Sequence, residues 1–197
     1  MRFSFLEVGS AFGIDVGGRL VKNEQAEHLY VASRVLGSLG DGNSIVEVGA
    51  GYGGTAYWIN LLNPTLTKYV IHDLPQINVV QGYFLSKALG VEVVSFYGES
   101  RKSIAVLPCN DLLDEPFNLL VNENSMPEIP EGAVHDYLRW SKKSCKRFYS
   151  YNHEAINPTQ PQVLVRDEVA AVGGYELRSR TPSWLRRGYI EELYDIR

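Results

Sequence analysis

The sequence contains little of what several common classes of protein need. Only two cysteines occur among its 197 residues, Cys109 and Cys145, and they form no C-x-x-C pair, so it lacks a structural zinc motif. No stretch approaches the ~18 consecutive apolar residues of a membrane-spanning helix, so we expect no membrane span. The N-terminus reaches Arg2 and Glu7 before any long apolar run, which predicts no signal peptide and a cytoplasmic protein.

Positive charge is also scarce, and the formal net charge of the chain is −4. The main basic cluster lies near the C-terminus and is typical of a solvated surface, so we expect no nucleic-acid partner. Its members are Arg178, Arg180, Arg186 and Arg187. Hydrophobic residues make up 45% of the chain, which is enough for a sizeable core in a single domain over residues 1–197. The glycine-rich residues 1–22 predict an arm or hairpin, and residues 23–43 predict a leading helix.

Beyond residue 43, strand patterns alternate with helix patterns. Runs of β-branched and aromatic residues predict seven strands, at 44–48, 68–73, 91–97, 117–121, 147–151, 174–181 and 189–196. Residues 100–116 are irregular, with at most a short helix. The last two strands are joined by a short link, so they must be antiparallel. We therefore predict an α/β fold with a Rossmann-like, mostly parallel seven-stranded sheet and an antiparallel C-terminal hairpin.

The most informative segment joins the first of these strands to the following helix. The strand at 44–48 runs into glycines at positions 49, 51, 53 and 54, and helical spacing starts at Ala56. Glycines at such a turn allow a tight backbone and let a ligand approach the amides closely. The N-terminus of the following helix favours electron-rich ligand groups. The segment therefore predicts a site for a nucleoside-containing cofactor.

The glycines alone fit two cofactors. Gly49-x-Gly51-x-x-Gly54 satisfies the fingerprint of dinucleotide-binding proteins. The same loop also reads Glu47-x-Gly49-x-Gly51-x-Gly53, the acid-x-G-x-G-x-G pattern of class I methyltransferases that use S-adenosylmethionine. The glycine spacing leaves both interpretations open.

A second acid, Asp73, ends the second predicted strand. It lies 24 positions after Gly49, near the ~20-residue offset at which an acid reaches a ribose hydroxyl pair. A carboxylate can accept both hydroxyls at once, so one residue at this place suffices. An alternative or additional role for Asp73 is to cap the helix that begins near Pro75.

Five segments between about residues 40 and 155 carry a more specific resemblance. They are Glu47-Val-Gly-Ala-Gly-Tyr-Gly-Gly, Asp73-Leu-Pro, Gln81-Gly-Tyr-Phe-Leu-Ser, Asn122-Glu-Asn-Ser-Met-Pro-Glu and Tyr149-Ser-Tyr-Asn-His. In these segments the chain resembles the sugar O-methyltransferases of bacterial surface-polysaccharide clusters, which are class I S-adenosylmethionine-dependent methyltransferases. The resemblance implies that fold, and it implies methyl transfer to a hydroxyl of a small polar acceptor, a sugar of a surface polysaccharide or glycoconjugate.

In open α/β sheets ligands bind beyond the carboxyl ends of the strands, so the expected cofactor residues follow the strands. We expect the glycine-loop amides to hold the methionine part of S-adenosylmethionine, Asp73 the ribose and Glu99 the adenine. The expected cofactor-binding residues are Glu47, Gly49, Ala50, Gly51, Tyr52, Gly53, Asp73, Leu74, Glu99 and Asn122.

A sugar hydroxyl is a weak acid, so methyl transfer to it needs a base or a metal. His153 is the first candidate for the base, because it directly follows the fifth predicted strand. Glu123, at the end of the fourth, is the second candidate. A divalent metal bound by these two residues with Asn122 and Asn152 is a less favoured alternative, because only two of the four are strong ligands.

Other polar and aromatic residues receive weaker interpretations. Ser125-x-x-Glu128 fits a capping box. His72 is expected to be packed inside its strand, and His28 receives no role. Four aromatic residues are candidates for packing against a sugar, although most are expected in the core or at the rim: Tyr52, Tyr57, Trp58 and Tyr149.

Two other functions stay open at this stage. An NAD-dependent oxidoreductase follows from the dinucleotide fingerprint, although the sequence shows no second domain for its substrate. A non-catalytic binding protein could retain a methyltransferase fold. The sequence supplies few residues for the acceptor side, so we expect a partner subunit, as in a homodimer, or the 1–22 arm to close it.

Overall fold

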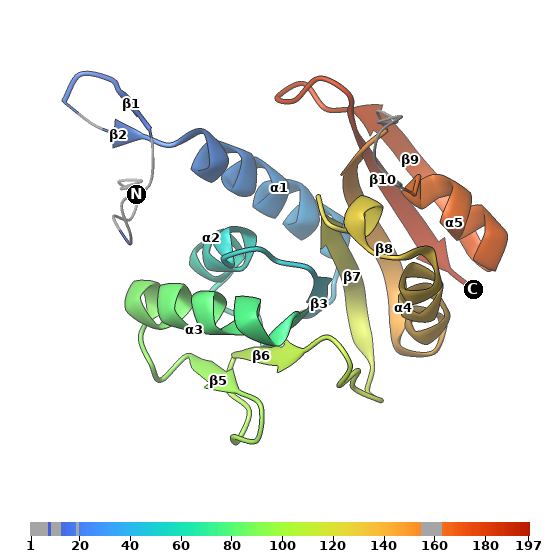
Figure 1. Cartoon of the computed structure of the whole chain (residues 1–197), viewed down its shortest axis with the longest axis horizontal. Helices are drawn as coiled ribbons and strands as arrows, with labels where there is room; N and C mark the ends of the chain where they lie inside the picture. The colour runs from blue at the N-terminus through green and yellow to red at the C-terminus, as the bar shows by residue number, and fades with distance from the viewer. Residues whose placement is uncertain (1–7, 9–12, 19, 155–162) are drawn as a thin grey trace.

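The structure, a computed structural model, describes residue 8 and residues 13–18, 20–154 and 163–197. In this part of the chain the main sheet has eight strands (Figure 1). In spatial order they are β5 (Val94–Phe96), β6 (Ile104–Pro108), β4 (Lys68–Asp73), β3 (Ser44–Val48), β7 (Phe117–Glu123), β8 (Cys145–His153), β10 (Tyr189–Ile196) and β9 (Tyr175–Pro182). Neighbours from β5 to β8 are parallel, whereas β10 is antiparallel to both β8 and β9. The predicted α/β fold is confirmed, with one strand more than expected.

Helices cover both faces of this sheet. The described α-helices are α1 (Asn23–Leu39), α2 (Gly54–Leu62), α3 (Pro75–Leu89), α4 (Glu131–Ser144) and α5 (Val165–Val172), and a 3-10 turn η1 spans Met126–Glu128. The first three helices pack on one face and α4 and α5 on the other (Figure 1). Successive strand residues point to opposite faces, so Ile45 joins the first core and Val46 the second. None of the described helices combines the length and apolar character needed to cross a membrane.

The additional strand is β6, which the sequence pattern did not predict. Residues 91–97 contribute the edge strand β5, as predicted but shorter, and Ile104–Pro108 lies between β5 and β4 and pairs with both. The irregular chain predicted at 100–116 is therefore wrong. The apolar run at 104–107 is buried on both faces, and such a run has no period that separates a strand from a helix segment. Because β6 separates β5 from β4, the loop after β6 is the one that lies beside the carboxyl end of β4.

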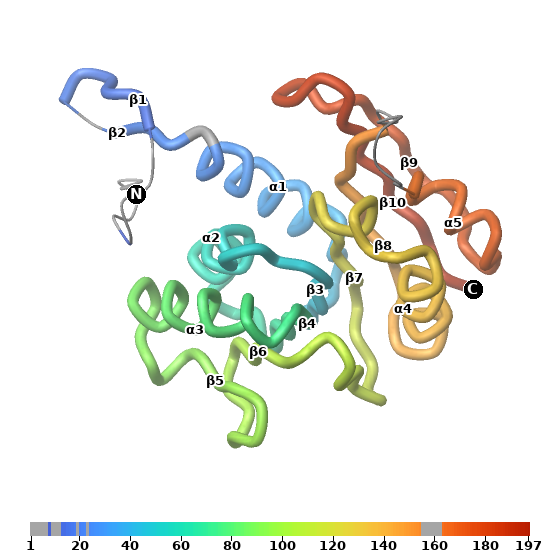
Figure 2. The backbone as a smooth tube through the Cα atoms, in the orientation of Figure 1, coloured from blue at the N-terminus to red at the C-terminus, as the bar shows by residue number. Residues whose placement is uncertain are grey.

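The two ends of the described chain approach the sheet differently. β1 (Ile14–Asp15) and β2 (Leu20–Val21) form a small antiparallel hairpin that stands away from the main sheet (Figure 1). After it, α1 runs back to lie against α2 and β7 (Figure 2). At the other end, the β9–β10 hairpin extends the sheet beyond β8. Both α1 and the link between β9 and β10 thereby come to the carboxyl ends of the parallel strands.

Candidate active site

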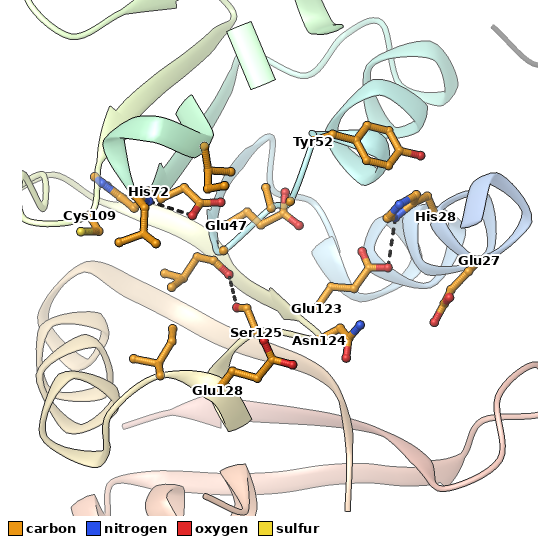
Figure 3. A pocket seen from close by; sticks show the side chains of 18 of the residues that line it. Glu27, His28, Glu47, Tyr52, His72, Cys109, Glu123, Asn124, Ser125 and Glu128 are labelled. Atoms are coloured by element: carbon orange, nitrogen blue, oxygen red, sulfur yellow. Dashed lines mark hydrogen bonds and ion pairs between the residues drawn. The ribbon is translucent and has the colours of Figure 1, made fainter. Parts of the chain in front are cut away.

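A cavity of about 1100 Å³ opens beyond the carboxyl ends of β3, β4 and β7 (Figure 3). Ligand pockets commonly measure ~300–1,000 Å³, so this cavity is at the large end of that range. Its walls come from the glycine loop after β3, the β4–α3 turn, the loops after β6 and β7, the start of α4, α1, and the link between β9 and β10. The sequence motifs predicted the first two of these walls but gave no sign of the last two.

The glycine loop has the backbone that its sequence predicted. Gly49 and Gly51 have φ angles of 72° and 56°, in the left-handed region that favours glycine. A Cβ atom on Gly49 would lie 2.1 Å from Oγ of Ser125, so no larger residue fits there. A Cβ atom on Gly51 would have no described atom within 4 Å, and this residue borders the cavity. A ligand can therefore come close to the main chain of the loop.

Asp73 ends β4 and lines the cavity beside this loop. Its Oδ1 accepts a hydrogen bond from the Leu74 amide at 2.8 Å, and its Oδ2 accepts one from Nε2 of Gln81 at 2.6 Å. Gln81, which is fully buried on α3, also donates to the carbonyl of Gly51 at 2.9 Å. Burial raises the pKa of Asp73, and these donors partly oppose that rise. Gln81 thus ties the acid to the glycine loop, a role that the sequence analysis missed.

Glu47 lies beneath the glycine loop with only 1% of its surface exposed. Its Oε2 accepts a hydrogen bond from the Tyr69 hydroxyl at 2.7 Å. Burial, together with the nearby Glu123, raises the pKa of Glu47 to about 8. The residue also lines the cavity, so a cationic ligand there would favour its charged form.

Glu123, the last residue of β7, points toward His28 of α1 (Figure 3). Nδ1 of His28 lies 3.1 Å from Oε1 of Glu123 and 3.0 Å from Oγ1 of Thr55. Thr55, on α2, donates its hydroxyl proton to Oε2 of the same carboxylate. One strand and two helices therefore meet at this carboxylate, and Glu123 and His28 both line the cavity.

His28 received no role from the sequence, because its partner Glu123 lies 95 positions away. Its ring packs so closely on Gly54 that a Cβ atom there would lie 2.4 Å from the ring Cδ2. The ring also meets Tyr52 edge-on, with the ring centroids 5.2 Å apart. Burial lowers the pKa of His28, but the carboxylate of Glu123, together with Glu47 and Glu27, more than offsets this, so the pKa lies above its ordinary value. Gly54 thus serves the packing of His28 as well as the turn.

Asn122 has a structural position in the sheet. It is fully buried, its Nδ2 donates to the Val48 carbonyl at 2.9 Å, and its Oδ1 accepts from Nδ2 of Asn152 at 2.9 Å. Ser125 donates to the same Val48 carbonyl at 3.0 Å and makes no side-chain cap, so the predicted capping box with Glu128 is wrong. Among the described residues that line the cavity, Asn122 is absent.

The residue after Glu123 reaches the cavity instead. Asn124 has a φ angle of 58°, which is unusual for a residue with a side chain, and its Oδ1 accepts a hydrogen bond from the Tyr189 hydroxyl at 2.7 Å. The left-handed backbone turns the chain away from the strand at this point. Asn124 therefore lies beside Glu123 on the cavity wall, a position that strand alternation alone would not give it.

His153, the first candidate for the base, is the last residue of β8 and does not belong to the cavity lining that the structure describes. Its ring contacts Tyr189, with 5.8 Å between ring centroids, and its buried Nδ1 has no hydrogen-bond partner in the described part of the chain. The next residue, Glu154, forms an ion pair with Arg180 at 2.6 Å. The fold thus brings Glu123 to the cavity and leaves His153 outside its lining.

Glu99 also lies apart from the cavity. It is exposed in the turn after β5, where its Oε2 accepts a hydrogen bond from the Phe96 amide at 3.0 Å. The loop after β6 contributes Cys109 to the cavity, and Tyr137 of α4 donates its hydroxyl to the Cys109 carbonyl at 3.3 Å. His72, buried in β4 as expected, lines the same end. Glu99 lies apart because β5 is the edge strand, and the unpredicted strand β6 lies between it and β4.

Of the four aromatic candidates for sugar packing, Tyr52 lines the cavity, while Tyr57, Trp58 and Tyr149 are buried in the core. The metal ligands suggested by the sequence do not converge, because Asn122 and its neighbour Glu123 point to opposite faces of β7. In the described residues, a different group has the proximity of metal ligands. It consists of Glu131, His135 and Glu168 at the contact between α4 and α5, outside the cavity lining.

A scan of protein-family models finds no match for this chain, and a search of curated proteins finds none either. Solved structures do match. The mitomycin 7-O-methyltransferase MmcR is similar with a TM-score of 0.66 and 12% identity, over 87% of this chain and 55% of that one. The S-adenosylmethionine-dependent methyltransferase SibL gives a TM-score of 0.65 and 11% identity, over 88% and 55%. This chain thus spans about half the length of both proteins.

A third solved structure matches over nearly its whole length. The glycopeptide N-methyltransferase MtfA gives a TM-score of 0.65 and 14% identity, over 88% of this chain and 96% of that one. Its complex with S-adenosylmethionine matches with a TM-score of 0.64. At such low identity these likenesses report the fold. This chain therefore has the α/β fold of class I methyltransferases, with a mainly parallel sheet and an antiparallel C-terminal hairpin.

Proposed function

We propose that this protein is an S-adenosylmethionine-dependent O-methyltransferase that acts on a hydroxyl of a small polar acceptor, a sugar. The observation that carries the proposal is that one cavity joins the glycine loop and Asp73 to the Glu123–His28 pair. A cofactor-binding loop and a proton-accepting group would then face the same space. When bound, the cofactor supplies a sulfonium methyl group that an oxygen nucleophile can take. The chain's own residues hold the two reactants and remove the acceptor proton.

The residues at the end of the cavity that the glycine loop and Asp73 form, here called the loop end, suit this cofactor. Gly51 presents main chain to open space, and the carboxylate of Asp73 can accept two ribose hydroxyls. S-adenosylmethionine carries a sulfonium and an ammonium group. Both would be attracted by Glu123, and their charge would favour the ionised form of Glu47. The pyrophosphate of NAD would be repelled by Glu123. The charge of the cavity therefore favours the methyl donor over the dinucleotide. The roles expected of Ala50, Tyr52, Gly53 and Leu74 remain part of this proposal.

The residues at the other end suit a sugar. Glu123 is our proposed base, because it is the candidate that lines the cavity. Asn124 and Glu128 provide oxygens and an amide for hydroxyl groups, and the ring of Tyr52 provides an apolar surface. The sequence resemblance to sugar O-methyltransferases supports the same acceptor class. Arg186, from the link between β9 and β10, adds a cation at the rim, where it pairs with Glu27 at 3.0 Å.

The cofactor assignment is tested by calorimetric titration with S-adenosylmethionine and S-adenosylhomocysteine, with NAD as the comparison ligand. We expect micromolar binding of both adenosyl ligands and at least tenfold weaker binding to Asp73→Ala, because a charge-assisted hydrogen bond contributes about 1.5–3 kcal/mol. Asp114→Ala removes an exposed carboxylate elsewhere and should bind like the wild type. Binding of NAD alone would favour an oxidoreductase. Binding of none of the three ligands would favour a non-catalytic protein with this fold.

The acceptor assignment needs a transfer assay. S-adenosylmethionine with a tritiated methyl group is incubated with the protein and matched acceptors: a hexose, a 6-deoxyhexose, a phenol and a primary amine. We expect label on a sugar hydroxyl, located by mass spectrometry after fragmentation. Label on the amine alone would replace the O-methyltransferase with an N-methyltransferase, and label on the phenol alone would replace the sugar. Either result would leave the cofactor assignment intact.

Two further expectations belong to this proposal. Closure of the acceptor side by a partner subunit or by the 1–22 arm predicts that deletion of residues 1–22 raises KM for the sugar more than the Kd for S-adenosylmethionine. Sedimentation of the full chain would show whether a homodimer is present. We place the reaction in the cytoplasm, where S-adenosylmethionine and nucleotide sugars are made.

A further inference from the structure

Two donors already hold the carboxylate of Glu123. An ionised carboxylate can only accept hydrogen bonds, so Nδ1 of His28, 3.1 Å from Oε1, donates to it in the tautomer protonated at Nδ1, and Thr55 donates to Oε2. A carboxylate oxygen can accept two hydrogen bonds, so each oxygen keeps a lone pair for a further donor. Glu123 borders the cavity, whereas Thr55 lies behind it, outside the described lining. The arrangement therefore fixes the direction of the carboxylate without consuming its capacity to take a proton.

We propose that His28 is the positioning residue for Glu123, and that the protonation state of this pair sets the lower pH limit of methyl transfer. This inference rests on the proposed function for its chemistry. With neutral His28 donating from Nδ1, Glu123 takes up the proton that the acceptor hydroxyl loses as its oxygen bonds to the methyl carbon and the methyl–sulfur bond breaks. A doubly protonated His28 places a full positive charge beside Glu123 and makes it a weaker base.

The support of α1 suits a positioning role, which requires a rigid side chain. Next to His28, Glu27 pairs with Arg186 at 3.0 Å. Two turns further along, Arg34 pairs with Glu191 of β10 at 2.8 Å. Together with the close packing of the imidazole on α2, these contacts hold the helix and the ring against the sheet. The position of His28 is therefore set by three neighbouring elements and not by its own helix alone.

The charges around the imidazole single out one partner. Glu123 faces it from β7, Glu47 from β3, Glu27 from α1, and the hydroxyl-bearing ring of Tyr52 from the glycine loop. Glu27 is engaged in an ion pair, and Glu47 accepts a hydrogen bond from a tyrosine. Of these acids, Glu123 is the one in hydrogen-bond contact with the ring. Titration of His28 should therefore respond to Glu123 more than to the other acids.

The first test needs no acceptor. The imidazole of His28 is titrated by NMR in the full chain without ligand, and its signal is assigned by its absence from His28→Asn. We expect a pKa above 6.5 in the wild type and a value at least about one unit lower in Glu123→Gln. Burial lowers the pKa of His28, and the variant lacks the carboxylate that counteracts this effect. Glu92→Gln, an exposed carboxylate elsewhere, should leave the titration unchanged. The same pKa in wild type and Glu123→Gln would overturn the proposal.

The second test compares pH–rate profiles of methyl transfer to the sugar that the wild type accepts. In His28→Asn the amide can still donate to Glu123 but does not titrate, so the acid limb should move to lower pH. His28→Ala should lower kcat about tenfold and leave KM for S-adenosylmethionine within about twofold. An unchanged acid limb in both variants would reduce His28 to a packing residue. If no sugar accepts the label, the acceptor assignment fails, and the NMR titration still decides whether the pair exists.

Discussion

The two ends of the cavity are built by different means. The loop end is made of main chain and of residues at or just after the ends of β3 and β4, within a stretch of 28 positions from Glu47 to Leu74. The Glu123 end is made of side chains from α1, α2 and β7 and from the link between β9 and β10. Local backbone requirements fix the first end, and only the completed fold assembles the second. The two ends should therefore fail separately when their residues are changed.

Glu123→Gln should have the largest effect, confined to the acceptor end. The glutamine amide keeps one acceptor oxygen but cannot take the acceptor proton, so kcat should fall by about 10²–10⁴, the usual contribution of a general base. The Kd for S-adenosylhomocysteine should stay within a few-fold, because the loop end is unchanged. Single-turnover transfer and calorimetry measure the two quantities.

A matched variant guards against an indirect effect of this change. Glu128→Gln also removes a cavity carboxylate, but one that is exposed and has no described contact with His28. We expect it to change KM for the sugar and to leave kcat within about threefold. Equal loss of kcat in both variants would show that net charge, and not the proton-accepting role of Glu123, drives transfer.

This contrast also explains what could be predicted from the sequence. The glycine loop and Asp73 were found because turns at strand ends need particular residues at particular spacings. The pairing of Glu123 with His28 carries no local signal, since it depends on where α1 crosses β7. Glu99 was misplaced for a different reason: the strand at 104–108 was not predicted, and it lies between β4 and the edge strand β5 that precedes Glu99.

Asn122→Ala should lower the stability of the sheet region that carries both ends of the cavity. Its side chain joins the Val48 carbonyl, the Asn152 amide and the Met126 amide, all inside the sheet or directly behind it. Alanine would leave buried polar groups without partners, which predicts a loss of about 2–4 kcal/mol in the free energy of unfolding. Urea denaturation measures it. Asn110→Ala, an exposed residue in the turn after β6, should change stability by less than about 0.5 kcal/mol.

Glu47→Gln tests the charge beneath the loop end. The pKa of Glu47 is raised from 4.5 to about 8, so the folded state holds a proton that the unfolded state releases. The stability that this proton provides is fully present below pH 4.5 and is lost as the pH rises through about 8. The ligand-free wild type should therefore lose up to a few kcal/mol between pH 5 and pH 8, and Glu47→Gln should lose less.

Denaturant midpoints of the wild type and Glu47→Gln, measured between pH 5 and pH 8, test this expectation. Glu92→Gln, which removes an exposed carboxylate, should keep the wild-type slope. A slope that is the same in all three proteins would mean that Glu47 is ionised in the folded protein and that a cation is not needed to charge it. The attraction between this end and the cationic cofactor would then be present before binding.

Gly54→Ala should have the smallest effect of these variants, but it distinguishes the two ends of the cavity most directly. Gly54 belongs to the glycine motif by sequence, yet a Cβ atom there would touch the ring of His28 and not the loop. Its φ angle lies outside the left-handed region, so alanine suits the start of α2 and the fold should persist. We expect kcat to fall about tenfold as His28 is displaced from Glu123, with Kd for S-adenosylhomocysteine unchanged. Loss of cofactor binding would instead place Gly54 in the dinucleotide-like role that its spacing suggests, and the two ends of the cavity would not be separable at this residue.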